Sequence, residues 1–266
     1  MAIATRKGVH LHWQEQGAGP PVLLIMGHRF SSALWYPVIP ALAAHHRVIG
    51  FDNRGTGESD TTARVTVQDL AADALAVLDA AGAPRAHIYG VSMGGVVALE
   101  LALQAPDRAL SLILGCTGVL TADKPRLPAA LRALYYLPTW ALRLILPNPG
   151  PQKGYGSAAS AEAIAHDQAM IRKDRSNTRG LIAQAAAIAG YSTTRDAIAA
   201  LPHPALVLHG DEDTVVPFPW GQELADTLAH SRFVRLEGAG HNFFVARRDE
   251  ANRAVVGFLA EVEGGG

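Results

Sequence analysis

The stretch Ile88-Tyr89-Gly90-Val91-Ser92-Met93-Gly94-Gly95-Val96-Val97-Ala98 decides the fold of this chain. An apolar run ends at Tyr89 and a helix-forming run follows Gly95, so the Gly-Xaa-Ser-Xaa-Gly sequence around Ser92 is expected on a tight strand-to-helix turn. Glycine at positions 90 and 94 removes the Cβ atoms that would collide in such a turn. The pattern predicts a nucleophile elbow that exposes the Ser92 hydroxyl.

The helix after the elbow supports this interpretation. Its unpaired backbone N–H groups and positive dipole end would point to the place where negative charge develops on a substrate carbonyl. The alternative is that Ser92 is an ordinary capping serine at the start of a helix. Two further motifs, described below, favour the nucleophile over the cap.

Composition sets the outer limits. The chain has 266 residues, 49% of them hydrophobic, and a formal net charge of -1. A chain of this length can form one large α/β domain or two small domains. Its charge gives no support to nucleic-acid binding, which normally needs a clustered basic excess. The single cysteine, Cys116, excludes an internal disulfide and is expected to be a buried small hydrophobe rather than a second nucleophile. Without a signal-peptide or membrane-spanning pattern, a cytoplasmic protein with no membrane partner is expected.

Apolar runs of strand length alternate with helical patterns on both sides of the elbow. The alternation predicts an α/β fold with a mainly parallel, eight-stranded sheet and helices on both faces. Turn chemistry at Lys7-Gly8 predicts that the first two strands form a hairpin. Strands are expected over residues 2–6, 9–16, 21–26, 46–51, 86–89, 110–114, 205–209 and 233–236, and helices over residues 32–45, 67–80, 93–104, 219–230 and 248–262.

The alternation stops near Gly118 and resumes after residue 200. We therefore expect a helical cap, residues 119–200, inserted into a core domain formed by residues 1–118 and 201–266. Cap residues Tyr135, Tyr136 and Trp140 would supply an apolar wall over Ser92. The last three glycines are expected to form a disordered tail.

Two loops that follow buried strands carry further polar groups. Residues 210–217 offer the three carboxylates of Asp211, Glu212 and Asp213, and residues 238–242 offer a glycine-flanked His241. Ligands bind beyond the carboxyl ends of parallel strands, so both loops are expected near Ser92. The serine needs a base to take its proton, and the base needs a buried carboxylate to fix its tautomer. His241 and Asp213 can fill these roles, with Asp211 or Glu212 as alternatives for the acid.

Together these motifs resemble those of serine hydrolases of the α/β-hydrolase family. The resemblance covers nearly all of both core segments and weakens through the cap. It implies that Ser92 is the nucleophile, Asp213 the acid and His241 the base. It also implies an oxyanion hole made by the backbone N–H groups of Met93 and His28. The matching motifs are GxSxG at Gly90–Gly94, GxxDxxxP at Gly210–Pro217, GxGH at Gly238–His241 and DxRGxGxS at Asp52–Ser59.

The resemblance implies a cofactor-independent esterase or lactonase without a metal, acting on small, largely apolar substrates as a monomer or homodimer. Serine at the elbow argues against the family's dehalogenases and epoxide hydrolases, which use an aspartate. C–C bond hydrolysis, thioester cleavage, perhydrolase chemistry and a slow-turnover ligand receptor stay open as alternatives. Between residues 120 and 200 basic residues outnumber acidic ones, so Arg29 and a basic cap rim could also contact an anionic substrate.

Overall fold

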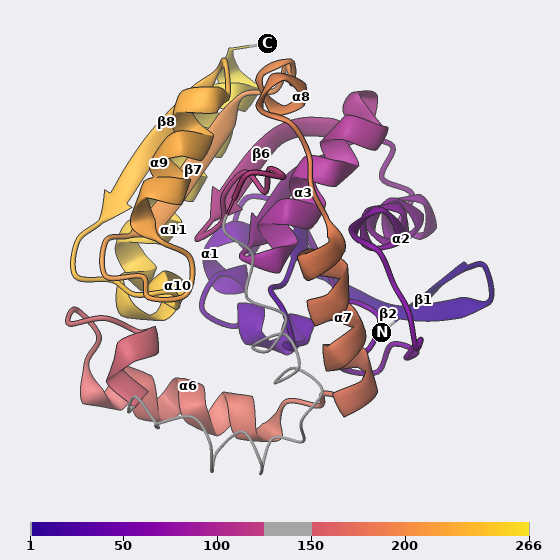
Figure 1. Ribbon diagram of the computed structural model, residues 1–266, viewed down its shortest axis with the longest axis horizontal. Coiled ribbons are helices and arrows are strands. Elements are labelled where there is room, and N and C mark those ends of the chain that lie inside the picture. Colours follow the sequence, from indigo (N-terminus) through magenta and orange to yellow (C-terminus); the bar gives the residue numbers. More distant parts are fainter. Residues whose placement is uncertain (1, 125–150, 266) are drawn as a thin grey trace.

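The strands in the described part of the chain form one eight-stranded sheet in the order β1-β2-β4-β3-β5-β6-β7-β8. Figure 1 shows the computed structural model, which describes residues 2–124 and 151–265. β1 and β2 form an antiparallel hairpin, β2 pairs antiparallel with β4, and all later pairs are parallel. The strands are β1 (Ala2–Arg6), β2 (Val9–Gln16), β3 (Pro21–Ile25), β4 (Arg47–Phe51), β5 (Ala86–Val91), β6 (Ala109–Gly115), β7 (Ala205–Gly210) and β8 (Ser231–Leu236).

Helices cover both faces of this sheet, which confirms the predicted fold class. In β3, Leu23 and Ile25 face a core shared with α2 and α3, whereas Val22 and Leu24 face a second core shared with α1 and α11. Both faces are buried, which is why the central strands read as continuous apolar runs. The helices are α1 (Ile39–Ala43), α2 (Val67–Ala80), α3 (Met93–Gln104), α6 (Ala161–Lys173), α7 (Thr178–Gly190), α8 (Arg195–Ala199), α9 (Phe218–Thr227), α10 (Phe243–Ala246) and α11 (Arg248–Gly264).

Two predicted segments differ from the structure. The helix expected over residues 32–45 is divided into a 3-10 turn, Ser32–Trp35, and the short α1. Pro37 has no N–H to continue the first turn, while Pro40 is tolerated because it stands in the first turn of α1. At the other end of the chain, α11 extends to Gly264, so that glycine does not belong to a disordered tail.

Residues 151–200, which make up most of the described part of the predicted cap, are tied to the loop that follows β4. Gly57 N–H donates to the Arg175 carbonyl at 2.7 Å, and the Gln184 side chain donates to the Arg54 carbonyl at 2.9 Å. A Cβ atom added at Gly180 of α7 would lie 2.3 Å from the Cα of Gly55. The cap helix therefore reaches the core by direct backbone contact. The predicted domain bounds stay a prediction, because residues 125–150 lie outside the described part.

Across the described residues, the structure contains no helix with both the length and the apolar character needed to cross a membrane.

We predict that Gly180→Ala lowers the melting temperature, because the new methyl group must push α7 away from Gly55. Overpacking of this kind costs about 1–3 kcal/mol, and each kcal/mol lowers Tm by about 2–4 °C in a domain of this size. Gly190→Ala is the matched control, since a Cβ at this other α7 glycine meets nothing within 4 Å. Equal melting temperatures for the two variants would contradict the close approach.

Candidate active site

Ser92 stands between the end of β5 and the start of α3 in a strained backbone conformation. Its φ is 55° and its ψ is -121°, a region that costs a non-glycine residue about 1–3 kcal/mol. The turn is tight on both sides. A Cβ at Gly90 would lie 2.1 Å from the Gly94 carbonyl oxygen, and a Cβ at Gly94 would lie 1.9 Å from the Ile25 carbonyl oxygen. Only glycine fits these two positions, so the sequence motif forms the predicted elbow.

The Ser92 side chain does not cap α3. Its hydroxyl accepts no hydrogen bond from the first turn of the helix. Ser92 is half-buried, and its backbone N–H donates to the Gly115 carbonyl at 2.8 Å. The capping alternative is therefore wrong for this serine.

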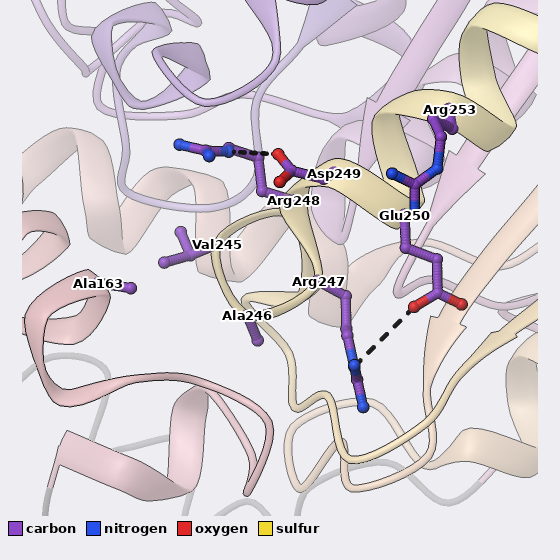
Figure 2. A pocket seen from close by; sticks show the side chains of 8 residues that line it. All are labelled: Ala163, Val245, Ala246, Arg247, Arg248, Asp249, Glu250 and Arg253. Carbon is purple, nitrogen blue, oxygen red and sulfur yellow. Dashed lines mark hydrogen bonds and ion pairs between the residues drawn. The ribbon is translucent and has the colours of Figure 1, made fainter.

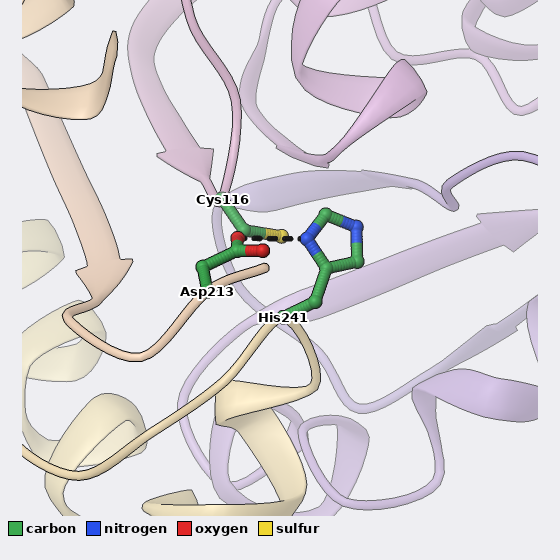
Figure 3. A group of neighbouring side chains, drawn as sticks. All are labelled: Cys116, Asp213 and His241. Atoms are coloured by element: carbon green, nitrogen blue, oxygen red, sulfur yellow. Dashed lines mark hydrogen bonds and ion pairs between the residues drawn. The ribbon is translucent and has the colours of Figure 1, made fainter. Parts of the chain in front are cut away.

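His241 lies against the carboxylate of Asp213 (Figure 3). Its Nδ1 is 2.8 Å from Asp213 Oδ2, and the Asp213 side chain is fully buried. The other oxygen, Oδ1, accepts the backbone N–H groups of Val215 and Val216 at 2.8 and 3.0 Å. Asp213 thus binds the imidazole through one oxygen and its own loop through the other. This leaves Nε2 of His241 as the nitrogen that can exchange a proton with a substrate or a serine.

The two neighbouring carboxylates have other partners. Asp211 accepts hydrogen bonds from Arg235 and from the Gly238 N–H, both at 2.7 Å. Glu212 accepts two hydrogen bonds from Ser157, also at 2.7 Å. The structure therefore brings Asp213 to His241 and uses Asp211 and Glu212 to hold the surrounding loops.

A second histidine, His209, contacts the same carboxylate. Its Nε2 lies 3.3 Å from Asp213 Oδ2 and 3.0 Å from the Val216 carbonyl oxygen, and its side chain is fully buried at the end of β7. Both neighbours are acceptors, so Nε2 carries the proton and donates it. None of the sequence motifs includes His209, although its position four residues before Asp213, at a strand end, was a usable signal.

The pKa values of the pair move in opposite directions. Burial raises the pKa of the Asp213 carboxyl, but hydrogen bonds from His209 and His241 outweigh it and hold this pKa well below its usual range. Burial lowers the pKa of His241, but the side chains of Cys116 and Asp213 outweigh it and raise this pKa above its ordinary value of 6.5. The pair therefore favours a charged Asp213 and stabilises the imidazolium form of His241.

The loop that carries His28, one of the two predicted oxyanion donors, lies beside the elbow. A Cβ at Gly27 would lie only 3.2 Å from Ser92 Cβ, so the loop after β3 passes directly against the serine. Among the described residues, the backbone N–H groups of His28 and Met93 donate no hydrogen bond. The His28 ring bonds the Leu181 carbonyl oxygen at 2.9 Å, and burial lowers its pKa, which favours the neutral ring.

The predicted substrate-contacting residues are only partly described. Arg29 is exposed, has a φ of 75° and lies over the Phe30 ring at 5.1 Å. Its backbone N–H donates to Gln184 Oε1 at 3.0 Å, which ties the loop to α7. Tyr135, Tyr136 and Trp140 lie outside the described residues.

Two of the hollows in the described part of the chain adjoin α6 or the Asp213 loop, and both lie away from Ser92. One, of about 350 Å³, separates α6 from the junction of α10 and α11 (Figure 2), and its charged groups pair with one another, as Arg248 does with Asp249 at 2.8 Å. The other, of about 450 Å³, adjoins the loop that carries Asp213 and lies beside Gln152 and Ser157. Neither hollow is lined by Ser92 or His241, so we assign no substrate to them.

Cys116 lies closer to the site than the sequence indicated. It follows β6, is fully buried as predicted, and has a φ of 40°. Its sulfur and the nearest ligand atoms of Asp213 and His241 all lie within 4.8 Å of one another (Figure 3). Its place at the end of a strand already put Cys116 near the expected site, but its approach to Asp213 and His241 depends on the order of three separate strands.

Comparisons with known proteins support the fold. A family model described as alpha/beta hydrolase fold matches residues 20–247. The chain is 29% identical to a putative carbamate hydrolase, RutD, of Azorhizobium caulinodans, covering 95% of the chain and 96% of that protein. It is 31% identical to a putative non-heme bromoperoxidase, BpoC, of Mycobacterium tuberculosis, covering 96% and 99%. The crystal structure of the enol-lactonase from Burkholderia xenovorans LB400 superposes on this chain with a TM-score of 0.83 and 27% sequence identity. The superposition covers 98% of this chain and 100% of the lactonase chain.

We predict that the acid side of the activity profile lies at higher pH than an ordinary histidine would give. His241 must be neutral to accept a proton, and its pKa is raised above 6.5, so kcat/KM should rise with pH through a midpoint above that value. The pH dependence of ester hydrolysis checks this, and NMR titration of the imidazole provides the matching resting-state value. In Asp213→Asn the NMR value should fall; a midpoint at or below 6.5 in the unaltered protein would contradict the prediction.

Proposed function

Because this chain belongs to the α/β-hydrolase fold family, we propose that it is a serine hydrolase that cleaves carboxylic esters or lactones through an acyl-enzyme on Ser92. The observation that carries the proposal is the strained Ser92 at the elbow, together with the 2.8 Å contact between His241 and Asp213. The same three residue types act together in acyl transfer on several unrelated folds. The lactonase relative adds support, since a lactone is a cyclic ester.

In the proposed reaction, Ser92 Oγ attacks the substrate carbonyl carbon while His241 Nε2 takes the hydroxyl proton. Asp213 keeps the proton on Nδ1 and stabilises the imidazolium that forms. The N–H groups of His28 and Met93 donate to the oxyanion, and His241 then returns its proton to the leaving alkoxide. A water molecule, activated by the same Nε2, cleaves the acyl-enzyme and restores Ser92.

The hydrogen bond that the mechanism needs between Ser92 and His241 is not present in the structure. Among the described residues, Ser92 Oγ has no hydrogen-bond partner, so the bond to His241 is not formed. Catalytic hydrogen bonds in substrate-free enzymes are often long and tighten only when substrate binds. The proposal therefore requires that the serine hydroxyl and Nε2 approach each other in the substrate complex.

Part of the basic charge predicted for the cap is neutralised in the structure. Arg175 pairs with Glu58 at 2.7 Å, and Arg195 pairs with Asp123 and Glu223 at 3.2 and 2.8 Å. These pairs reduce the field that would attract an anionic substrate. We therefore propose small, largely apolar esters and lactones as the substrate class, without a requirement for negative charge.

We predict that Ser92→Ala and His241→Ala each abolish ester turnover and that the double variant is little worse than either, because the two residues act as a unit. Initial rates on chromogenic acyl esters of increasing chain length check this. A fluorophosphonate probe should label Ser92 alone, as mapped by mass spectrometry. Near-normal turnover in Ser92→Ala, or labelling at another residue, would contradict the mechanism.

We predict that Asp213→Asn lowers kcat by about four orders of magnitude, as amide substitution of a triad acid does by stabilising the wrong tautomer. Asp211→Asn and Glu212→Gln are the matched controls, because their carboxylates contact Arg235 and Ser157 rather than His241. Both controls should stay within a few-fold of the unaltered enzyme. If Asp211→Asn were inactive while Asp213→Asn stayed active, Asp211 rather than Asp213 would be the triad acid.

The same assays separate an enzyme from a slow-turnover receptor. A working hydrolase should complete many turnovers per chain, with a kcat of about 1 per second or more on a good substrate. At most one turnover per chain across a broad panel of esters and lactones would favour the receptor.

A further inference from the structure

Three good metal ligands of different types converge beside the Ser92 elbow. Cys116 follows β6, Asp213 follows β7 and His241 follows β8, so neighbouring strand ends bring them together. Their ligand atoms all lie within 4.8 Å of one another, and Cys116 and Asp213 are buried. The proposed hydrolysis uses only two of the three and leaves the thiol without a role. Thiolate, imidazole and carboxylate are the ligands that zinc prefers.

We propose that Cys116, Asp213 and His241 together bind one thiophilic divalent cation of the zinc class, and that this binding withdraws His241 from catalysis. Binding itself depends only on the three side chains. Its inhibitory consequence rests on the function proposed above.

The distances fit such an ion after small movements. Zinc bonds of about 2.0–2.3 Å to nitrogen, oxygen and sulfur place tetrahedral ligands roughly 3.3–3.6 Å apart. Asp213 Oδ2 and His241 Nδ1, now 2.8 Å apart, must open slightly, while the Cys116 sulfur must approach them by at most about 1.2 Å. The Val215 and Val216 N–H groups can keep Asp213 Oδ1 in place throughout.

Protons and charges balance in this step. The Cys116 thiol releases its proton to solvent, and neutral His241 moves its proton from Nδ1 to Nε2, which frees the Nδ1 lone pair for the metal. A thiolate and a carboxylate then neutralise the two positive charges, so the buried site has no net charge. Nε2 now carries a proton and cannot accept one from Ser92, which is why the bound ion would stop catalysis.

Cadmium is the probe for binding, because a cadmium–thiolate bond gives an ultraviolet charge-transfer band. The chain has one cysteine, so any such band must come from Cys116. Metal-stripped unaltered protein and Ser92→Ala should each develop the band to one cadmium per chain. Cys116→Ser, or Cys116→Ala if the serine variant does not fold, should show no band.

His241→Ala tests whether the thiol acts alone. This variant keeps Cys116 but loses the imidazole. Residues that only support a metal ligand change affinity by about 10- to 100-fold when mutated, so the loss of a ligand itself should lower cadmium affinity by at least that much. Equal affinity in His241→Ala and the unaltered protein would overturn the three-ligand site. So would the absence of a band at one equivalent of cadmium.

Zinc inhibition of ester hydrolysis supplies the second readout. Each variant is compared with its own metal-free rate, and the inhibitory zinc concentration should rise at least about tenfold in Cys116→Ser. An unchanged inhibitory concentration would overturn the link to catalysis. If only the proposed function were wrong, the unaltered protein and Ser92→Ala would still bind cadmium, but no form of the protein would hydrolyse an ester. The two failures can therefore be told apart.

Discussion

The positive φ of Ser92 is the constraint on which the rest of the site depends. This conformation persists only because the surrounding backbone leaves no room to relax. A side chain at Gly90 would clash with the Gly94 carbonyl, and one at Gly94 would clash with the Ile25 carbonyl. The backbones of β5, α3 and β3 are therefore packed closely around this one turn. The backbone strain is confined to Ser92, but the packing of the whole central sheet is what maintains it. A fold with a looser β3–β5 pairing could not hold the hydroxyl at the sheet edge.

The cap reaches this constraint through the loop after β3. His28 bonds Leu181 and Arg29 bonds Gln184, and Gln184 in turn bonds Arg54 in the loop after β4. One helix, α7, therefore fixes both the proposed oxyanion donor and the neighbouring core loop. In the proposed mechanism, α7 would thus hold an oxyanion donor in position before substrate arrives, which is the condition under which such donors are most effective.

Much of this arrangement could be predicted from the sequence, because strand, turn and loop signals are local. The bounds of β1, β2, α2 and α3 were predicted correctly, and the eight-stranded sheet and family are confirmed. The roles of Ser92, Asp213 and His241 stay predictions, although the structure brings the last two together. Pro37 divided an expected helix. The approach of Cys116 to Asp213 depends on strand order and on how far each strand extends, which local sequence signals do not fix. For His209, only its position four residues before Asp213 offered a signal.

The environment of Asp213 has a consequence for how the imidazole can move. Oδ1 faces two backbone N–H groups, while Oδ2 faces two histidine nitrogens, so donors surround the carboxylate. Rotating it would break several of these bonds at once, and a 180° flip of the His241 ring would leave Oδ2 facing a carbon atom. The ring is thus locked in one orientation. In the proposed reaction, every proton transferred in acylation and in deacylation would therefore pass through the same nitrogen, and the starting protonation state would return without any side chain having to rotate.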